Sequence, residues 1–209
     1  MSVKNIKIIQ RGRSMVEMLG VLAIIGVLSI GGIAGYSKAM MQYKINKTTD
    51  QIVQIVSGLR TLYSSQDEYD VSCPGAGCAI LEKGHIAPDE MWDSGSLVNP
   101  FGGAVSVQTS GKKATGDNKA FTVSSSGLPK EACMALATYD WGSGSSSGLI
   151  AVTIGSGAAP DTFASLKGCN GAAATPIACP NGSNLKVPMP VATAAGKCGN
   201  SGYILLKFF

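Results

Sequence analysis

Residues 12–36 read GRSMVEMLGVLAIIGVLSIGGIAGY, and this stretch decides how the rest of the chain is interpreted. From Met18 to Tyr36 it holds 19 residues without a charged side chain. An α-helix needs roughly 20 apolar residues to span a bilayer. No other part of the 209-residue chain repeats this pattern. The stretch therefore predicts a helix that a membrane can hold.

The helical pattern continues beyond the apolar stretch. No proline occurs between Arg13 and Gln66. Apolar residues recur there mostly at steps of three, four or seven, which draws one stripe along a helix; they are Tyr36, Met40, Ile45, Ile52, Ile55, Leu59 and Leu62. We expect one helix over residues 13–66, about 75–80 Å long at 1.5 Å per residue. A cleaved secretory signal is the alternative, but its apolar run would be shorter and a cleavage site would follow it.

Basic residues precede the apolar stretch. Lys4, Lys7 and Arg11 lie within residues 1–12 without an acid among them. This bias predicts that the N-terminus stays in the cytoplasm while the rest of the chain is exported. Of the 17 basic and 13 acidic residues, 14 basic and 13 acidic remain after residue 12. A basic surface for nucleic acid is therefore not expected.

Glu17 is the one charged residue at the start of the apolar run. A carboxylate at such a position costs free energy unless it is paired. It could lie at the membrane interface and reach the lipid headgroups, or it could pair with a positive charge from another molecule. Arg13 could also pair with it within one chain.

Six cysteines follow the apolar stretch: Cys73, Cys78, Cys133, Cys169, Cys179 and Cys198. An even number of cysteines in an exported region favours disulfide bridges over free thiols or a zinc site. The spacing of Cys169 and Cys179 is wider than that of the usual zinc-binding pair. His85 is the only histidine and is expected to be solvated. No P-loop and no clustered carboxylate pair occurs, so we expect no enzyme activity, cofactor or metal.

Short runs bounded by Gly, Asn and Ser follow Gln66. Strands are expected at residues 99–109, 119–128, 147–154 and 201–208. A short helix is expected at residues 129–140, with Pro129 near its start. Residues 79–92 are expected to hold a helical turn or two.

Gly12, followed five residues later by Glu17 and then by the apolar helix, resembles the N-terminal signature of type IV pilins and pseudopilins. The resemblance implies that a prepilin peptidase cuts between Gly12 and Arg13 and that Arg13 is then N-methylated. It also implies that Glu17 pairs with the N-terminal amine of a neighbouring subunit. Two positions depart from the pattern. Arg13 stands where a bulky apolar residue is usual, and Ala34 stands where many type IVa pilins have proline, which favours the type IVb branch.

Two further runs, GHIAPDEMWDSGSLVNPFGG at residues 84–103 and AFTVSSSGLPKEACMAL at residues 120–136, resemble type IVb and PilS-like conjugative pilins in their order. The resemblance covers most of residues 13–140 and does not extend to residues 160–196. It implies an α+β roll, in which the second half of the long helix packs on a twisted antiparallel sheet. It also implies three bridges, Cys133–Cys198, Cys73–Cys78 and Cys169–Cys179.

Three parts are thus expected: a basic leader at residues 1–12, a long helix at 13–66 and a disulfide-containing head at 67–209. Within the helix, residues 13–36 are the membrane and filament segment and residues 37–66 are the spine of the head. The resemblance implies a subunit of a type IVb-like or conjugative pilus, for adhesion, aggregation or mating contact.

The implied partners are other copies of the chain in a helical homopolymer, the prepilin peptidase, the inner-membrane assembly machinery, and membrane lipid before assembly. The precursor is expected in the inner membrane and the product in an extracellular pilus. Two alternatives stay open: a pseudopilin of a type II secretion system, and a membrane-anchored binding domain that does not polymerise.

Overall fold

The computed structural model describes residues 14–73, 78–110, 118–142, 147–157, 159, 177–179 and 185–209. The chain forms two compact units, Met1–Gln42 and Tyr43–Phe209. Helix α1 (Met15–Leu62) contributes its first part to one unit and its second part to the other. Each unit is described by itself below.

The first unit, where it is described, consists of the start of α1. Ser14 precedes the helix, and its carbonyl accepts the backbone N–H groups of Glu17 and Met18. Serine is a favoured residue type before a helix, and an acid in the first turn suits the positive end of the helix dipole. Within the apolar run, the Ser29 hydroxyl donates to the carbonyl of Ile25 at 2.7 Å. This polar group is therefore satisfied by the helix itself, as a non-aqueous surrounding requires.

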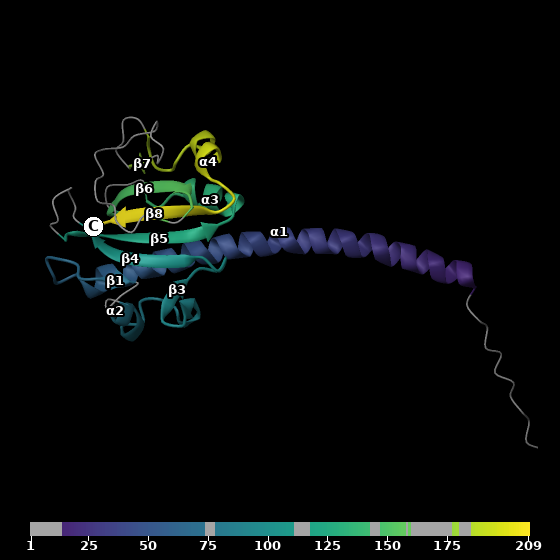
Figure 1. The fold of residues 1–209 in the computed structure, drawn as a ribbon, viewed down its shortest axis with the longest axis horizontal. Coiled ribbons are helices and arrows are strands. Elements are labelled where there is room, and N and C mark those ends of the chain that lie inside the picture. Colours follow the sequence, from purple (N-terminus) through teal and green to yellow (C-terminus); the bar gives the residue numbers. More distant parts are fainter. Residues whose placement is uncertain are drawn as a thin grey trace, which may run out of the picture. The chain divides into compact units, whose positions relative to one another are not determined.

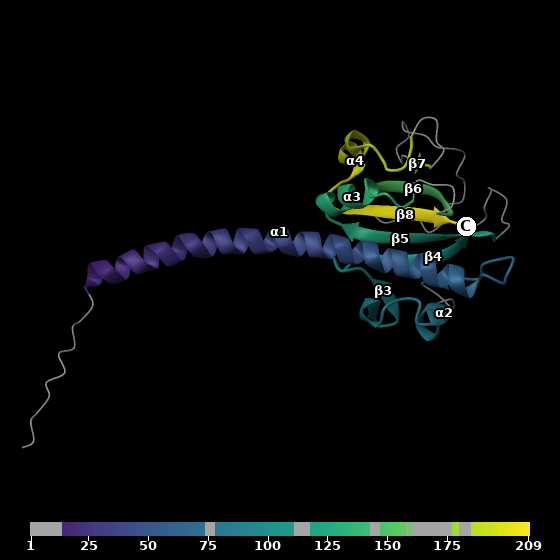
Figure 2. The ribbon, with the colours of Figure 1, turned by 180° about the vertical axis from the view of Figure 1, so that it is seen from behind.

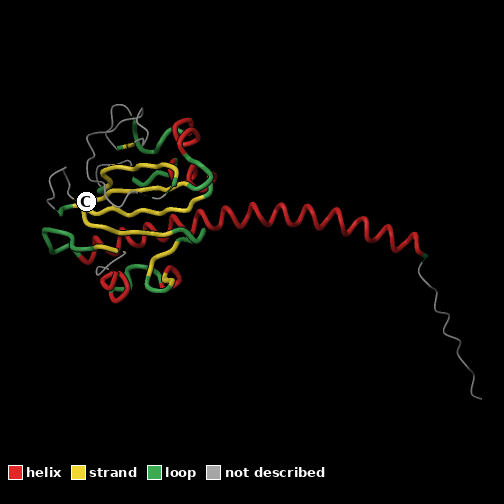
Figure 3. Tube along the Cα trace, in the orientation of Figure 1, coloured by secondary structure: helices red, strands yellow, loops and turns green. Residues whose placement is uncertain are grey.

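The second unit is built on one antiparallel sheet with the strand order β2-β3-β4-β5-β8-β6-β7, and β1 pairs with β4 (Figures 1 and 3). The strands are β1 (Ser72–Cys73), β2 (Trp92–Asp93), β3 (Ser96–Val98), β4 (Ala104–Ser110), β5 (Ala120–Leu128), β6 (Leu149–Ser156), β7 (Ile177–Ala178) and β8 (Gly202–Phe208). The other elements are α2 (Cys78–Lys83), the 3₁₀ turn η1 (Asp89–Met91), α3 (Lys130–Ala137) and α4 (Val191–Lys197).

The part of α1 from Tyr43 to Leu62 crosses one face of this sheet (Figure 2). Its side chains Ile52, Ile55 and Leu59 are almost entirely buried, as is Phe121 of β5. These three positions of α1 recur at steps of three and four, so they share one face of the helix. The amphipathic half of the long helix thus provides one layer of the core.

Strand β8 lies in the middle of the sheet, between β5 and β6, and all seven of its residues are buried. Tyr203 and Leu205 form one apolar cluster with Ala151 of β6. The Phe208 ring instead stacks on that of Phe121, with ring centroids 5.8 Å apart. Because both faces of β8 are covered, the strand reads as a nearly continuous apolar run rather than an alternating one.

The predicted α+β fold class is confirmed, because a long N-terminal helix packs on an antiparallel sheet. The strands predicted at residues 119–128, 147–154 and 201–208 correspond to β5, β6 and β8. The strand predicted from residue 99 begins only at Ala104. The reason is a turn in which the Asn99 side-chain oxygen accepts the backbone N–H groups of Phe101 and Gly103. The long helix ends at Leu62 rather than at residue 66, and the short elements β1, β2, β3, β7 and α4 were not predicted.

Candidate functional site

The first half of α1 exposes large apolar side chains over its whole circumference. Val27 and Ile30 are 73% and 74% exposed. The full set comprises Met15, Val16, Met18, Leu19, Val21, Leu22, Ile24, Ile25, Val27, Leu28, Ile30, Ile33 and Tyr36. Leaving such surface in water costs roughly 25 cal/mol for each Å². This surface, which we call the apolar segment, therefore needs lipid or another protein chain around it.

Among the described residues, α1 is the one helix long and apolar enough to cross a membrane. Its best 18-residue window has a mean hydropathy of 2.2, and none of that window is buried within the chain. The core helix of a soluble protein would instead bury most of its apolar residues. The exposure of the segment distinguishes α1 from such a core helix.

Only two charged residues occur between Ser14 and Gln42, namely Glu17 and Lys38. They are 21 positions apart in the sequence, which is about 31 Å along a helix. A hydrocarbon core is about 30 Å thick, so the two charges fit its opposite boundaries. Lys38 is too far along the helix to neutralise Glu17 of the same chain. Gly12 and Arg13, the expected cleavage and methylation positions, lie outside the described residues.

The glycines of the apolar segment leave unoccupied space beside the helix. A Cβ atom added at Gly31, Gly32 or Gly35 would meet no atom within 4 Å. At Gly58, in the second half of the helix, an added Cβ would lie 2.8 Å from Cγ2 of Ile86. Packing within the chain therefore explains a small residue at Gly58. It does not explain the glycines of the segment.

Two disulfide bridges lie within the described part of the head. Cys73 is joined to Cys78, at a sequence separation of 5, and Cys133 is joined to Cys198, at a separation of 65. In the chain-entropy model, closing the shorter loop contributes about 2 kcal/mol and closing the longer one about 4 kcal/mol. The longer bridge ties α3 to the residue that follows α4. Cys179 is also disulfide-bonded, and its expected partner Cys169 lies outside the described residues.

An ion pair joins α1 to the 3₁₀ turn η1. Lys47 Nζ donates to Glu90 Oε2 at 2.6 Å, and Gln51 Nε2 donates to Glu90 Oε1 at 3.3 Å. The hydrogen bond to Lys47 lowers the pKa of Glu90, and the hydrogen bond to Glu90 raises the pKa of Lys47. The sequence offered no signal for this pair, because its members are 43 residues apart.

His85 is exposed just after α2 and adopts a positive φ of 48°. No group of three or more His, Cys, Asp or Glu side chains suited to a metal ion occurs among the residues that the structure describes. The features that stand out are therefore the apolar segment with its single carboxylate and the head that carries it.

Comparisons with known proteins point to one group. A family model, PilS N terminal, matches residues 42–193. The major structural subunit of bundle-forming pilus from Escherichia coli is 28% identical over 137 residues, which are 64% of this chain and 66% of the relative. Toxin coregulated pilin from Vibrio cholerae is 26% identical over 129 residues, 62% of this chain and 57% of the relative. The chain thus spans less than two thirds of the length of these relatives.

A solved structure has the same fold. The crystal structure of a type IV pilin from Vibrio cholerae El Tor biotype matches with a TM-score of 0.56 at 18% identity. The match covers 80% of this chain and 99% of that one. It supports the helix-on-sheet architecture described above.

Proposed function

The chain belongs to the PilS family of type IV pilins, because the family model matches residues 42–193, more than half of the chain, and we propose that it is a structural subunit of a type IV pilus. The observation that carries the proposal is the apolar segment: apolar side chains cover the whole circumference of the helix, and one carboxylate, Glu17, lies at its start. Such a surface suits lipid first and a bundle of identical helices afterwards.

Assembly through the apolar segment accounts for Glu17. A carboxylate and an ammonium are each costly in hydrocarbon, and pairing the two removes most of that cost. We propose that cleavage after Gly12 releases the basic leader at residues 1–12 and creates a new amine at Arg13. The Glu17 carboxylate of one subunit then pairs with the Arg13 amine of its neighbour and sets the axial register of the filament.

The rest of the chain fits this role. Residues 13–36 serve as membrane anchor and filament core, residues 37–66 as the spine of the head, and residues 67–209 as the disulfide-containing head. The precursor lies in the inner membrane with its N-terminus inside, and the prepilin peptidase and the assembly machinery act on it there. The product is a surface filament of the type IVb-like or conjugative kind, used in adhesion, aggregation or mating contact. The role is structural and needs no catalytic group.

The maturation step is tested by mass spectrometry of the protein from cells that express the peptidase. We expect a chain that begins at Arg13 and carries an added methyl group. A chain that still begins at Met1 would contradict the proposed cleavage. A chain that begins at Arg13 without the methyl group would contradict the methylation alone.

The pairing is tested by Glu17→Gln, with Glu82→Gln as the matched control. Glu82 is an exposed residue of α2, so the control makes the same chemical change outside the apolar segment. In Glu17→Gln the Arg13 amine of the neighbouring subunit is left buried without a partner, and an unpaired buried charge costs about 3–5 kcal/mol. We therefore expect Glu17→Gln to lower the yield of sheared filaments at least about tenfold. Electron microscopy and blotting of the sheared fraction measure the yield. Equal yields from Glu17→Gln and the parent would overturn the pairing.

A further inference from the structure

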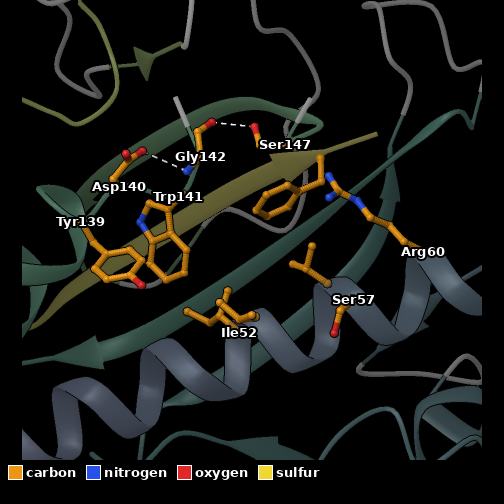
Figure 4. A pocket seen from close by; sticks show the side chains of 11 residues that line it. Ile52, Ser57, Arg60, Tyr139, Asp140, Trp141, Gly142 and Ser147 are labelled. Carbon is orange, nitrogen blue, oxygen red and sulfur yellow. Dashed lines mark hydrogen bonds between the residues drawn. The ribbon is translucent and has the colours of Figure 1, made fainter. Parts of the chain in front are cut away.

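A pocket of about 540 Å³ lies in the second unit, between α1 and the turn that follows α3 (Figure 4). One wall is the face of α1 that carries Ile52, Val56 and Ser57. The opposite wall is the turn from Tyr139 to Gly142. Its volume falls in the range of roughly 300–1,000 Å³ that small-molecule sites occupy. The pocket lies outside the apolar segment that carries the proposed assembly.

Aromatic rings form the apolar part of this pocket. Tyr139 and Trp141 meet edge to face with ring centroids 4.9 Å apart. The Trp141 indole N–H donates to the Leu136 carbonyl at 2.8 Å, which satisfies the ring's only donor and holds it in place. Trp141 is buried, while Tyr139 is 46% exposed. A flat apolar molecule would thus meet ring surface that is already ordered, which keeps the entropic cost of binding low.

Arg60 of α1 lies at the other end of the pocket (Figure 4). Its guanidinium carbon is 5.2 Å from the centre of the Phe208 ring. Its Nε and Nη2 atoms are buried, and no acceptor among the described residues bonds to them. Burial lowers the pKa of Arg60, because it removes water from the charged guanidinium, while Tyr69 partly offsets the shift.

A buried donor without an acceptor is costly, and an anion at this position would supply one. A guanidinium offers parallel N–H groups that match a carboxylate in two places at once. A second acid in the ligand would be unfavourable, because Asp140 lines the Tyr139 end of the pocket. The Asp140 Oδ1 atom accepts the Gly142 N–H at 3.0 Å there.

Gly148 makes room for the guanidinium. It adopts a positive φ of 67°, and a Cβ atom added to it would overlap Arg60 Nη2. Any larger residue would therefore displace the charged group. The backbone at residue 148 thus helps to place Arg60 where it is.

We propose that this pocket binds an organic monoanion in which one carboxylate is joined to a flat apolar body. The carboxylate pairs with the Arg60 guanidinium, and the apolar body contacts Trp141, Tyr139 and the Ile52 face of α1. The ligand class follows from the pocket having one cationic end and one aromatic end.

The test uses the full-length chain in lipid nanodiscs, labelled with 5-fluorotryptophan. The chain has two tryptophans, so ¹⁹F spectra report Trp141 in the pocket and Trp92 of β2 as an internal control. The probes are 3-phenylpropionate and its neutral isostere 3-phenylpropanamide. We expect the propionate to shift the Trp141 signal saturably and the amide to bind roughly tenfold more weakly, since a charge-assisted hydrogen bond contributes at least that much. The Trp92 signal should not move.

Arg60→Met removes the charge but keeps an apolar side chain beside Phe208, and it should lower propionate binding to the level of the amide. Lys44→Met is the matched control, because Lys44 lies on the same helix, over the Phe101 ring and outside the pocket. Equal loss in both variants would overturn the proposal. So would equal binding of the two probes to the parent, or no shift of Trp141 by either. If Arg60→Met does not fold, the difference in binding of the two probes to the parent protein still tests the proposal.

Discussion

From Met15 to Ile33, α1 leaves its apolar side chains exposed, whereas between Tyr43 and Leu62 it buries Ile45, Ile52, Ile55, Val56 and Leu59. The helix is continuous in its backbone hydrogen bonding through both parts. What differs is the placement of polar residues. The first part has apolar residues on every side, so no face is directed to a core. The second part gathers most of its apolar residues in one stripe, which packs on the sheet.

This comparison shows that one helix can depend on two different surroundings. The second part is stabilised by residues of the same chain, such as Ile86 beside Gly58 and Phe208 beside Arg60. The first part has no such partners among the described residues, and it needs lipid or neighbouring subunits. A substitution should therefore affect folding in one part and assembly in the other.

The largest expected effect comes from shortening one isoleucine in each part. Ile55 is fully buried and Ile25 is 53% exposed. We expect Ile55→Ala to lower the free energy of unfolding of the head by about 3 kcal/mol, because it leaves a cavity in the core. Ile25→Ala should change it by no more than about 0.5 kcal/mol. Urea unfolding followed by near-ultraviolet circular dichroism, with the chain in nanodiscs, measures both. Similar losses of unfolding free energy in the two variants would contradict the division of α1 into an exposed part and a packed part.

A smaller effect is expected at the glycines. Gly58→Ala would bring a Cβ atom to 2.8 Å from Cγ2 of Ile86, while Gly35→Ala would meet nothing. Overpacking costs about 1–3 kcal/mol, and replacing glycine by alanine in a helix returns about 1 kcal/mol. We therefore expect a net loss of about 1 kcal/mol at Gly58 and no loss at Gly35, in the same unfolding assay. Destabilisation of the head by Gly35→Ala would show that the first part does pack on its own chain.

If Gly35 lies in a close contact between the helices of neighbouring subunits, Gly35→Ala should weaken assembly and leave folding unchanged. The filament yield that tests Glu17 measures this as well. An unchanged yield would mean that Gly35 is an ordinary small residue of an apolar helix, rather than one half of a small-xxx-small contact with Gly31.

The smallest effect is expected from the ion pair that fastens the second part of α1. The pKa of Glu90 lies below its ordinary value of 4.5, so the pair stabilises the fold above that pH and loses its contribution as pH falls through the lowered pKa. The pKa of Lys47 lies above 10.5, so the contribution is full below that pH and is lost as pH rises through the raised pKa. Stability from the pair should be constant between about pH 4.5 and 10.5.

Glu90→Gln should remove this pH dependence. Added salt should weaken the ion pair, because the pair is at the surface. Carbon-13 NMR titration of the glutamate carboxyl groups measures the pKa of Glu90 directly. The matched control is Asp93→Asn, at an exposed acid of β2. A Glu90 pKa at its ordinary value would show that the pair is not formed in solution.

Much of the fold followed from local patterns. The apolar stretch, the amphipathic stripe and the alternating runs predicted α1, β5, β6 and β8 within a few residues. Local patterns failed where a side chain caps a turn, as Asn99 does before β4. They also failed to predict α4, a short helix whose seven residues VATAAGK offer little periodicity.

The residues of the candidate sites also differ in whether the sequence alone could identify them. Glu17 was identifiable from the sequence, since a carboxylate beside an uncharged run stands out without knowledge of the fold. Arg60 was not, because one arginine near the end of an amphipathic helix is ordinary. Its orphaned donors depend on Phe208 and Gly148, which lie far away in the sequence.

By itself, the sequence determined that a long helix carries an apolar half and an amphipathic half, because helical periodicity and charge are local properties. It also determined that strands follow. Only the tertiary structure decided that β8 lies between β5 and β6, and that Lys47 meets Glu90. Those outcomes depend on contacts between distant residues, whose pairing is selected by burial of the whole core rather than by any local run.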